Sequence, residues 1–243
     1  SPFTPRMQLF VLAHELGPLA HDHIWKSVGW YALFTFPTAF LTVLVTRRRG
    51  GMGVPAAVPL GIFVLVVIQL TALVVLEAHP LAVGETGPTA TMTAADAALY
   101  GTYLAQNGTV STVRAGMTFT ERELLELTLI KSANNYTMSL ALWAFGSNDA
   151  YVAAARAWLT AHGLDRIVIN EPSGIDRANV APADQLVELG KIALENPVIA
   201  EIVSTKAATV PQVGVIPNTN ELLGISGVDG IKTGYTQASG FNL

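Results

Sequence analysis

Two tripeptides in the chain carry side chains suited to acyl transfer. Residues 132–134 read S-A-N and offer a hydroxyl beside a carboxamide, and residues 232–234 read K-T-G and offer a cation, a hydroxyl and a glycine. A serine acyl-transferase needs a nucleophile, a group that moves its proton, and fixed donors for the developing oxyanion and a substrate carboxylate. The two tripeptides contain groups for most of these tasks.

Each of these residues has a definable role in such chemistry. Ser132 can relay a proton, and Asn134 can hold a substrate amide. Lys232 can place a positive charge beside the site, Thr233 can donate a hydrogen bond to a carboxylate, and Gly234 leaves room for substrate along the strand. Each tripeptide alone is common by chance. The simpler alternative is a surface serine, an asparagine that ends a helix and a lysine on an edge strand.

The elements that must position these residues follow from local patterns. Residues 120–123 read T-x-x-E, a capping box that opens a helix with an apolar side. Turn signals lie at Pro172-Ser173-Gly174 and Pro217-Asn218. We expect an α+β fold in which helices pack on an antiparallel sheet. Further helices are predicted at about 136–145, 149–162 (capped by Gly163) and 183–195 (ended by Asn196-Pro197), and strands at 209–215 and 228–236.

Longer motifs surround the two tripeptides. In order, they are AGMTFT (115–120), KSANNY (131–136), EPSGID (171–176), STK (204–206), NTNELL (218–223) and GVDGIKTGYT (227–236). With these motifs the chain resembles the serine D-alanyl-D-alanine carboxypeptidases of peptidase family S11, whose turn N-P-S-G-L-D is similar to EPSGID. The resemblance covers about Thr71 to Leu243. It implies a β-lactamase/transpeptidase-like domain with Ser132, Asn134 and Lys232 in catalysis and Thr233 and Gly234 in substrate binding.

The resemblance also implies a function. Members of the family remove the terminal D-alanine from peptidoglycan stem peptides through an acyl-serine, without a metal or an organic cofactor. A stem peptide or a β-lactam is therefore the expected ligand. Two alternatives stay open: a catalytically inactive, membrane-anchored protein that binds cell-wall peptides, and a β-lactamase-like hydrolase, a class that typically has S-D-N where this chain has S-A-N.

One motif of the family is missing. S-x-x-K, whose serine is the nucleophile and whose lysine is the proton acceptor, occurs nowhere in the 243 residues. Residues 71–77, TALVVLE, resemble the body of the helix that carries it, which places the equivalent positions near Leu65 and Ile68. Neither side chain can attack a carbonyl carbon or accept a proton. The sequence therefore predicts the family's fold and leaves hydrolytic activity open.

Two uncharged runs precede the globular part. Residues 28–46 and 54–76 are each long enough to cross a bilayer as a helix. The arginines at 47–49 predict a cytoplasmic loop by the positive-inside rule, which puts residues after about 77 outside the bacterial cell membrane. The second run is equally compatible with a buried core helix. We expect an interfacial segment (1–26), two apolar helices (27–76) and a carboxypeptidase-like domain (77–243) that is truncated at its C-terminus.

Composition narrows the classes of function. Hydrophobic residues make up 51% of the chain and charged residues 13%, which is more apolar than a typical soluble domain. No basic cluster suited to nucleic acid is present beyond the arginine run. The absence of cysteine excludes thiolate catalysis and disulfides. His14, His21 and His23 lack the spacing of a metal-binding helix, so no metal site is expected and an interfacial stretch is the favoured interpretation.

Overall fold

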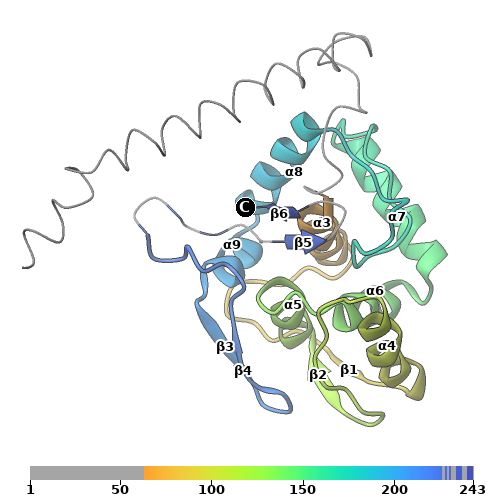
Figure 1. Ribbon diagram of the computed structural model, residues 1–243, viewed down its shortest axis with the longest axis vertical. Helices are drawn as coiled ribbons and strands as arrows, with labels where there is room; N and C mark the ends of the chain where they lie inside the picture. The colour runs from red at the N-terminus through yellow and green to blue at the C-terminus, as the bar shows by residue number, and fades with distance from the viewer. Residues whose placement is uncertain (1–62, 226–227, 229, 231–233, 237–239, 243) are drawn as a thin grey trace, which may run out of the picture. The chain divides into compact units, whose positions relative to one another are not determined.

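The computed structural model describes residues 63–225, 228, 230, 234–236 and 240–242. By its backbone contacts the chain divides into two compact units, 1–57 and 58–243, and every described residue belongs to the second. Its elements are α3 (Phe63–Ala78), β1 (Thr89–Thr91), α4 (Ala94–Ala105), β2 (Thr118–Thr120), α5 (Glu121–Leu129), α6 (Asn134–Phe145), α7 (Asn148–Ala161), α8 (Ala183–Glu195), α9 (Pro197–Ser204), β3 (Ala207–Val210), β4 (Gly214–Pro217), β5 (Gly234–Thr236) and β6 (Gly240–Asn242) (Figure 1).

Helix α3 forms the centre of the core. Every residue from Val67 to Leu76 is buried, and the helix contacts α5, α6, α7, α8 and β5. Its sequence carries no charge before Glu77, which is typical of a helix that is covered on all faces. None of the helices described in residues 63–225 is both long and apolar enough to cross a bilayer. Residues 67–76 of the apolar run 54–76 are buried in the core, whereas the run 28–46 lies outside the described residues.

Capping boxes start two of the helices. In α5, Glu123 N donates to Thr120 Oγ1 at 3.2 Å and Thr120 N donates to Glu123 Oε2 at 2.8 Å, which confirms the predicted box. Thr93 and Asp96 form the same reciprocal pair at the start of α4. Helix α4 was not predicted, although its T-x-x-D start is a recognisable signal.

The other predicted helices are present, with shifted ends. Helix α6 begins at Asn134, two residues earlier than predicted. Helix α7 ends before Gly163, whose φ of +69° suits a C-terminal glycine cap, and α8 spans the predicted residues. Asn196 then caps a helix that was not predicted, α9, because its Oδ1 accepts from Val198 N and Ile199 N. The Asn-Pro pair that ends α8 thus starts α9.

The prediction of one strand over residues 209–215 is wrong. The chain forms the hairpin β3–β4 there, with Ala207 opposite Pro217 and a turn at residues 211–213. Pro211 cannot donate to a ladder, and Gly214 adopts a φ of +97° that other residues rarely adopt. A β-rich segment therefore folds back on itself.

The second predicted strand, over residues 228–236, is confirmed at residues 234–236, whereas residues 229 and 231–233 lie outside the described residues. Residues 228 and 230 are not in a strand, and β5 begins at Gly234. Strand β1 pairs with β2, β3 pairs with β4, and β5 pairs with β6, each pair antiparallel. Within the part of the chain that the structure describes, helices around α3 and antiparallel strand pairs agree with the predicted α+β class.

Candidate active site

Ser132 lies in the short loop between α5 and α6, residues 130–133, called here the Ser132 loop. Its φ of +62° is a left-handed backbone conformation, which costs a non-glycine residue roughly 1–2 kcal/mol. Ala133 N donates to Leu127 O at 3.0 Å and holds the loop against α5. Ser132 is only 9% exposed, so the alternative of a surface serine is wrong. Strain of this kind gathers at functional sites, where surrounding contacts enforce it.

Asn134 opens α6 and is buried. Its Nδ2 donates to Ser173 O at 3.0 Å, and its backbone N donates to Thr109 O at 2.8 Å. A Cβ atom on Gly108 would lie 2.9 Å from Asn134 Oδ1, so the backbone approaches this side chain as closely as only glycine permits. The alternative of an asparagine that ends a helix is wrong. The bond to Ser173 O uses one of the two amide hydrogens of Asn134 and leaves the second hydrogen outside that bond.

Glu171 organises the turn of residues 171–176 that Asn134 contacts. Its buried carboxylate accepts from Ser173 N at 2.7 Å, Asp176 N at 3.2 Å and Asn179 Nδ2 at 2.9 Å. Three donors offset the cost of burying the negative charge. Glu171 stands where the family motif has asparagine, and here it holds the turn that the sequence predicts.

Thr71 joins helix α3 to the same turn. Its Oγ1 lies 2.8 Å from Pro172 O, 2.7 Å from Tyr151 OH and 2.9 Å from Val67 O. Burial raises the pKa of Tyr151, so the phenol remains neutral and can donate to Thr71. Helices α3 and α7 and the 171–176 turn therefore form one hydrogen-bonded unit. Both Thr71 and Glu171 lie in motifs of the sequence, but the hydrogen bonds that they form in the structure were not predicted.

Helix α3 also contains Leu65 and Ile68, near which the nucleophile and base of the family are predicted. Leu65 lies in the first turn of the helix, and Ile68 is fully buried in the core. Next to Ile68, Gln69 Nε2 is buried without a hydrogen-bond partner among the described residues, which costs about 1–3 kcal/mol. The helix is present as predicted, but Leu65 and Ile68 supply neither nucleophile nor base.

The K-T-G motif is described at its last residue. Gly234 begins β5, where it lies opposite Asn242 of β6, and β5 contacts α3. The strand thus lies against the helix whose first turn contains Leu65. Lys232 and Thr233 lie outside the described residues, so their roles stay predictions, and His14, His21 and His23 also lie outside them.

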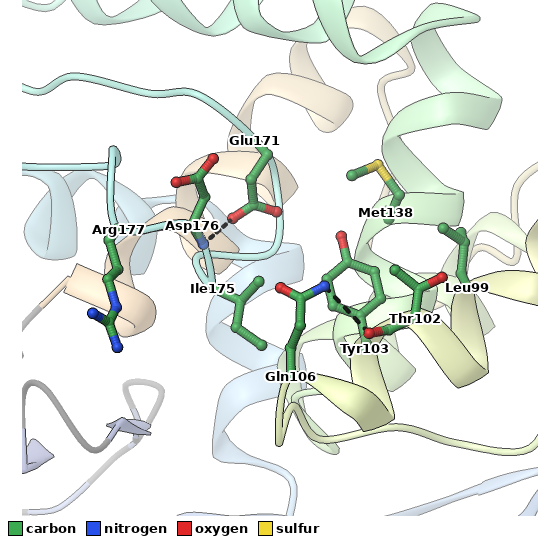
Figure 2. Close-up of a pocket in the computed structure, with 9 residues that line it drawn as sticks. All are labelled: Leu99, Thr102, Tyr103, Gln106, Met138, Glu171, Ile175, Asp176 and Arg177. Atoms are coloured by element: carbon green, nitrogen blue, oxygen red, sulfur yellow. Dashed lines mark hydrogen bonds between the residues drawn. The ribbon is translucent and has the colours of Figure 1, made fainter.

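A cavity of about 490 Å³ opens between α4, α6 and the 171–176 turn (Figure 2). A Cβ atom on Gly108 would lie 3.0 Å from Ile175 Cδ1, so the cavity wall adjoins Asn134. Burial, and then the charge of Glu171, raise the pKa of Tyr103, which keeps its phenol protonated. The volume suits a small molecule or part of a peptide. The lining residues are Leu99, Thr102, Tyr103, Gln106, Met138, Glu171, Ile175, Asp176 and Arg177.

Known proteins are similar to this chain in sequence. The family model of peptidase S11, D-alanyl-D-alanine carboxypeptidase, matches residues 68–243. The chain is 34% identical to D-alanyl-D-alanine carboxypeptidase DacB2 of Mycobacterium tuberculosis, over 52% of this chain and 46% of that protein. It is 29% identical to the D-alanyl-D-alanine endopeptidase of Pseudomonas aeruginosa, over 81% of this chain and 60% of that protein. The chain thus spans about half the length of the curated relatives it matches.

Solved structures share the fold. The crystal structure of a D-alanyl-D-alanine carboxypeptidase from Mycobacterium tuberculosis matches with a TM-score of 0.61 at 29% identity, over 72% of this chain and 64% of that one. The Streptomyces K15 DD-transpeptidase matches with a TM-score of 0.62 at 22% identity, over 73% and 72% of the two chains. The fold is that of the penicillin-binding proteins, as the motifs predict.

Proposed function

This chain belongs to the peptidase S11 family of D-alanyl-D-alanine carboxypeptidases, and from that premise we propose that it serves peptidoglycan metabolism by recognising the D-alanyl-D-alanine end of stem peptides. The observation that carries the proposal is the frame around Ser132 and Asn134. A strained serine and a buried carboxamide lie two residues apart in the chain. Ala133 N bonds the Ser132 loop to α5, and Asn134 Nδ2 bonds the start of α6 to the 171–176 turn. Such a frame costs stability and orients polar groups.

The chemistry of the ligand matches these groups. A stem peptide that ends in D-alanyl-D-alanine presents an amide carbonyl and a terminal carboxylate. The second amide hydrogen of Asn134 suits the carbonyl, and the proposed partners of the carboxylate are Lys232 and Thr233. A β-lactam offers a similar carbonyl and carboxylate and is the second expected ligand.

We further propose that binding occurs without an acyl-serine on α3. Such an intermediate forms when a serine Oγ bonds to the carbonyl carbon, the hydroxyl proton passes to a base, and the terminal D-alanine leaves as the amine. Leu65 has no nucleophilic atom, and Ile68 lies in the core without a basic group. The site then acts as a receptor for cell-wall peptides, whereas its relatives are named as peptidases.

The ligand also supports a location. Peptidoglycan lies outside the cytoplasmic membrane, so the residues after about 77 are proposed to be extracytoplasmic. The arginine run at 47–49, between the two apolar runs, supports the same orientation of a membrane-associated chain.

Titration calorimetry with diacetyl-L-lysyl-D-alanyl-D-alanine tests the proposal, with the same peptide ending in L-alanyl-L-alanine as the control ligand. We expect saturable binding of the D-form alone, weakened about tenfold or more by Lys232→Met because a charged hydrogen bond is lost. Lys191→Met, which changes a lysine that pairs with Glu188 on α8, leaves the affinity unchanged.

Two outcomes contradict the proposal. A folded chain that does not distinguish the D-form from the L-form does not recognise D-alanyl-D-alanine. Release of free D-alanine from the peptide, measured in the same samples, would show that a second residue has taken over the role of nucleophile. In that case the chain is a working carboxypeptidase, and the receptor role is wrong.

A further inference from the structure

The segment 218–220 reads N-T-N and belongs to neither active-site tripeptide. Its backbone contacts the end of α5, because Thr219 N donates to Ile130 O at 3.2 Å. Ile130 is the C-cap residue of α5 and stands two positions before Ser132. Helix C-termini leave carbonyl groups unpaired, and Thr219 satisfies one of them. The segment is therefore fixed to the base of the Ser132 loop.

Asn220 extends the same segment toward the K-T-G motif. Its Nδ2 donates to Gly230 O at 3.0 Å, and Gly230 stands two positions before Lys232. Its Oδ1 accepts from Leu222 N at 3.0 Å, which orients the carboxamide with the amine toward Gly230. The side chain is 5% exposed, so solvent cannot readily replace these bonds.

Asn218 anchors the segment on α9. Its Nδ2 donates to Val203 O at 3.1 Å and to Thr205 O at 2.9 Å, and its Oδ1 accepts from Asn220 N at 2.9 Å. Gly230 packs on the same end of α9. A Cβ atom on it would lie 2.8 Å from Val203 Cγ2, and its φ of +148° already favours glycine.

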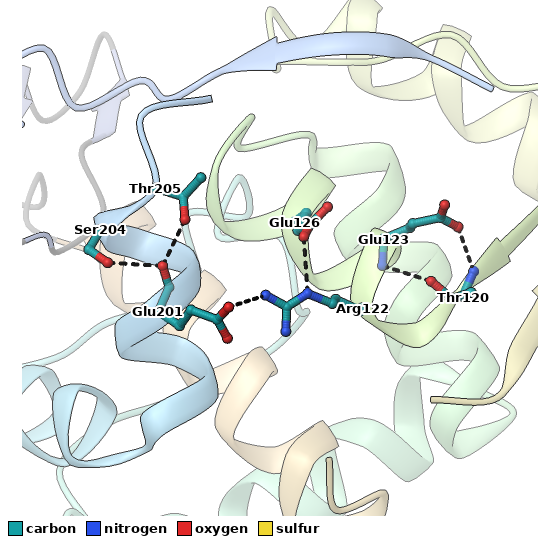
Figure 3. Close-up of polar contacts among 7 residues, drawn as sticks. All are labelled: Thr120, Arg122, Glu123, Glu126, Glu201, Ser204 and Thr205. Carbon is teal, nitrogen blue, oxygen red and sulfur yellow. Dashed lines mark hydrogen bonds and ion pairs between the residues drawn. The ribbon is translucent and has the colours of Figure 1, made fainter. Parts of the chain in front are cut away.

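An ion-pair cluster joins α9 back to α5 (Figure 3). Arg122 of α5 lies 2.7 Å from a carboxylate oxygen of Glu201 on α9 and 3.2 Å from that of Glu126 on its own helix. The hydroxyls of Ser204 and Thr205 donate to Glu201 O and close the last turn of α9. Helix α5 therefore supports the segment 218–220 twice, directly at Ile130 and through α9.

We propose that residues 218–220 are a bridge that holds the Ser132 loop and Gly230 in register, with Asn220 as its positioning residue. The bridge bonds to Ile130, two residues before Ser132, and to Gly230, two residues before the K-T-G motif in the sequence. Misplacement of a binding group by about 1 Å can cost a hundredfold in activity. This inference rests on the proposed function, because it assumes that both motifs contact one peptide, and it deepens that function by naming what holds them in register.

Asn220→Asp tests the bridge with little change of shape. The aspartate keeps an acceptor for Leu222 N and loses the donor to Gly230 O. Gln185→Glu in α8 is the matched control, since Gln185 Nε2 donates to Gly163 O at 3.2 Å and its Oε1 accepts from Arg166 N at 3.0 Å. Both changes therefore remove one amide donor to a backbone carbonyl.

Affinity for diacetyl-L-lysyl-D-alanyl-D-alanine and the amide NMR spectrum are measured for both variants. We expect Asn220→Asp to weaken the affinity about tenfold and to shift the amide signals of Gly230 and Gly234, with Asn220→Ala giving the same result. Gln185→Glu leaves the affinity and both signals unchanged, although it lowers the melting temperature about as much as Asn220→Asp does.

The two readouts separate the bridge from the proposed function. If Asn220→Asp binds the peptide as tightly as the unmodified protein, the bridge does not position the site and the inference is overturned. If the unmodified protein binds no peptide, the proposed function fails. In that case the amide signals alone test the bridge, and unchanged signals at Gly230 and Gly234 in Asn220→Asp overturn it.

Discussion

The Ser132 loop and helix α3 hold their places by different forces. Next to the Ser132 loop the contacts are directional hydrogen bonds. Asn134 donates through its side-chain amide to Ser173 O and through its backbone N to Thr109 O, and the Glu171 carboxylate accepts three hydrogen bonds within its turn and from Asn179. Along α3 the residues from Val67 to Leu76 fill the core. Directional bonds depend on the identity of each residue, whereas core packing depends mainly on volume and apolarity.

That difference explains how the fold persists without its S-x-x-K motif. Near the positions predicted for the nucleophile and the base, Leu65 and Ile68 belong to a helix that is still formed, and Ile68 is fully buried. The Ser132 loop has no comparable freedom, because its strained backbone requires the contacts around it. Packing and chemistry are therefore separable in this molecule, and substitutions on the two sides should have different signatures.

The largest expected effect comes from a cavity in α3. Leu70 is fully buried, and Leu70→Ala should lower the free energy of unfolding by about 3 kcal/mol because it removes apolar contacts and leaves a void. Urea denaturation followed by circular dichroism measures it. Leu104→Ala on α4, where the leucine is 53% exposed, is the control and should change the free energy by about 0.5 kcal/mol or less. A loss of less than about 1 kcal/mol at Leu70 would show that α3 is not the centre of the core.

A smaller effect is expected where the two regions meet. Thr71→Val keeps the volume of the side chain but removes the hydroxyl between Tyr151 and Pro172 O, and should cost about 2 kcal/mol. Tyr151→Phe removes the other partner. In a double-mutant cycle by urea denaturation, the combined loss should be smaller than the sum of the single losses. Strict additivity would show that the two hydroxyls do not interact.

The smallest expected effect concerns a buried acid at the start of α5. Glu121 is 1% exposed, and neither carboxylate oxygen has a hydrogen-bond partner in the described part of the chain. Burial raises the pKa of Glu121 above its ordinary value, opposed in part by the charge of His79. The folded protein thus holds this proton more tightly than the unfolded chain does. Its contribution to stability is present below the unfolded pKa and is lost as pH rises through the folded pKa.

Glu121→Gln should remove the loss of stability that ionisation of the buried Glu121 causes as pH rises. The variant should gain about 1 kcal/mol in the free energy of unfolding at pH 7, and the gain should disappear in acid, where the native glutamate is protonated. Thermal unfolding across the pH range measures the difference, with Glu77→Gln at an exposed position of α3 as the control. A variant less stable than the native chain at pH 7 would mean that Glu121 is stabilised as an anion.

Local signals in the sequence predict much of this fold. The predictions of the capping box at Thr120 and of the bounds of α8 are confirmed, because a helix start or end depends on a few neighbouring residues. The strand prediction at 209–215 fails because apolar β-branched residues mark a strand without showing where it turns, and the proline at 211 was the signal to use.

The candidate site is less predictable, because its contacts join distant residues. The motifs identify Ser132 and Asn134, but the hydrogen bond from Thr71 to Pro172 O spans 101 residues and that from Asn220 to Gly230 O spans 10. No periodicity encodes such pairs. The left-handed conformation of Ser132 is also invisible in a sequence, since it arises from the surrounding contacts.

The central claim is that this chain keeps the frame of a D-alanyl-D-alanine recognition site without a nucleophile on α3. Fluorescent penicillin labelling of the folded protein, followed by peptide mapping by mass spectrometry, tests it most directly. We expect no covalent adduct on the unmodified chain or on Leu65→Ser alone, and an adduct at position 65 in the double variant Leu65→Ser/Ile68→Lys. A stoichiometric adduct on the unmodified chain, at Ser132 or at any other serine, would contradict it.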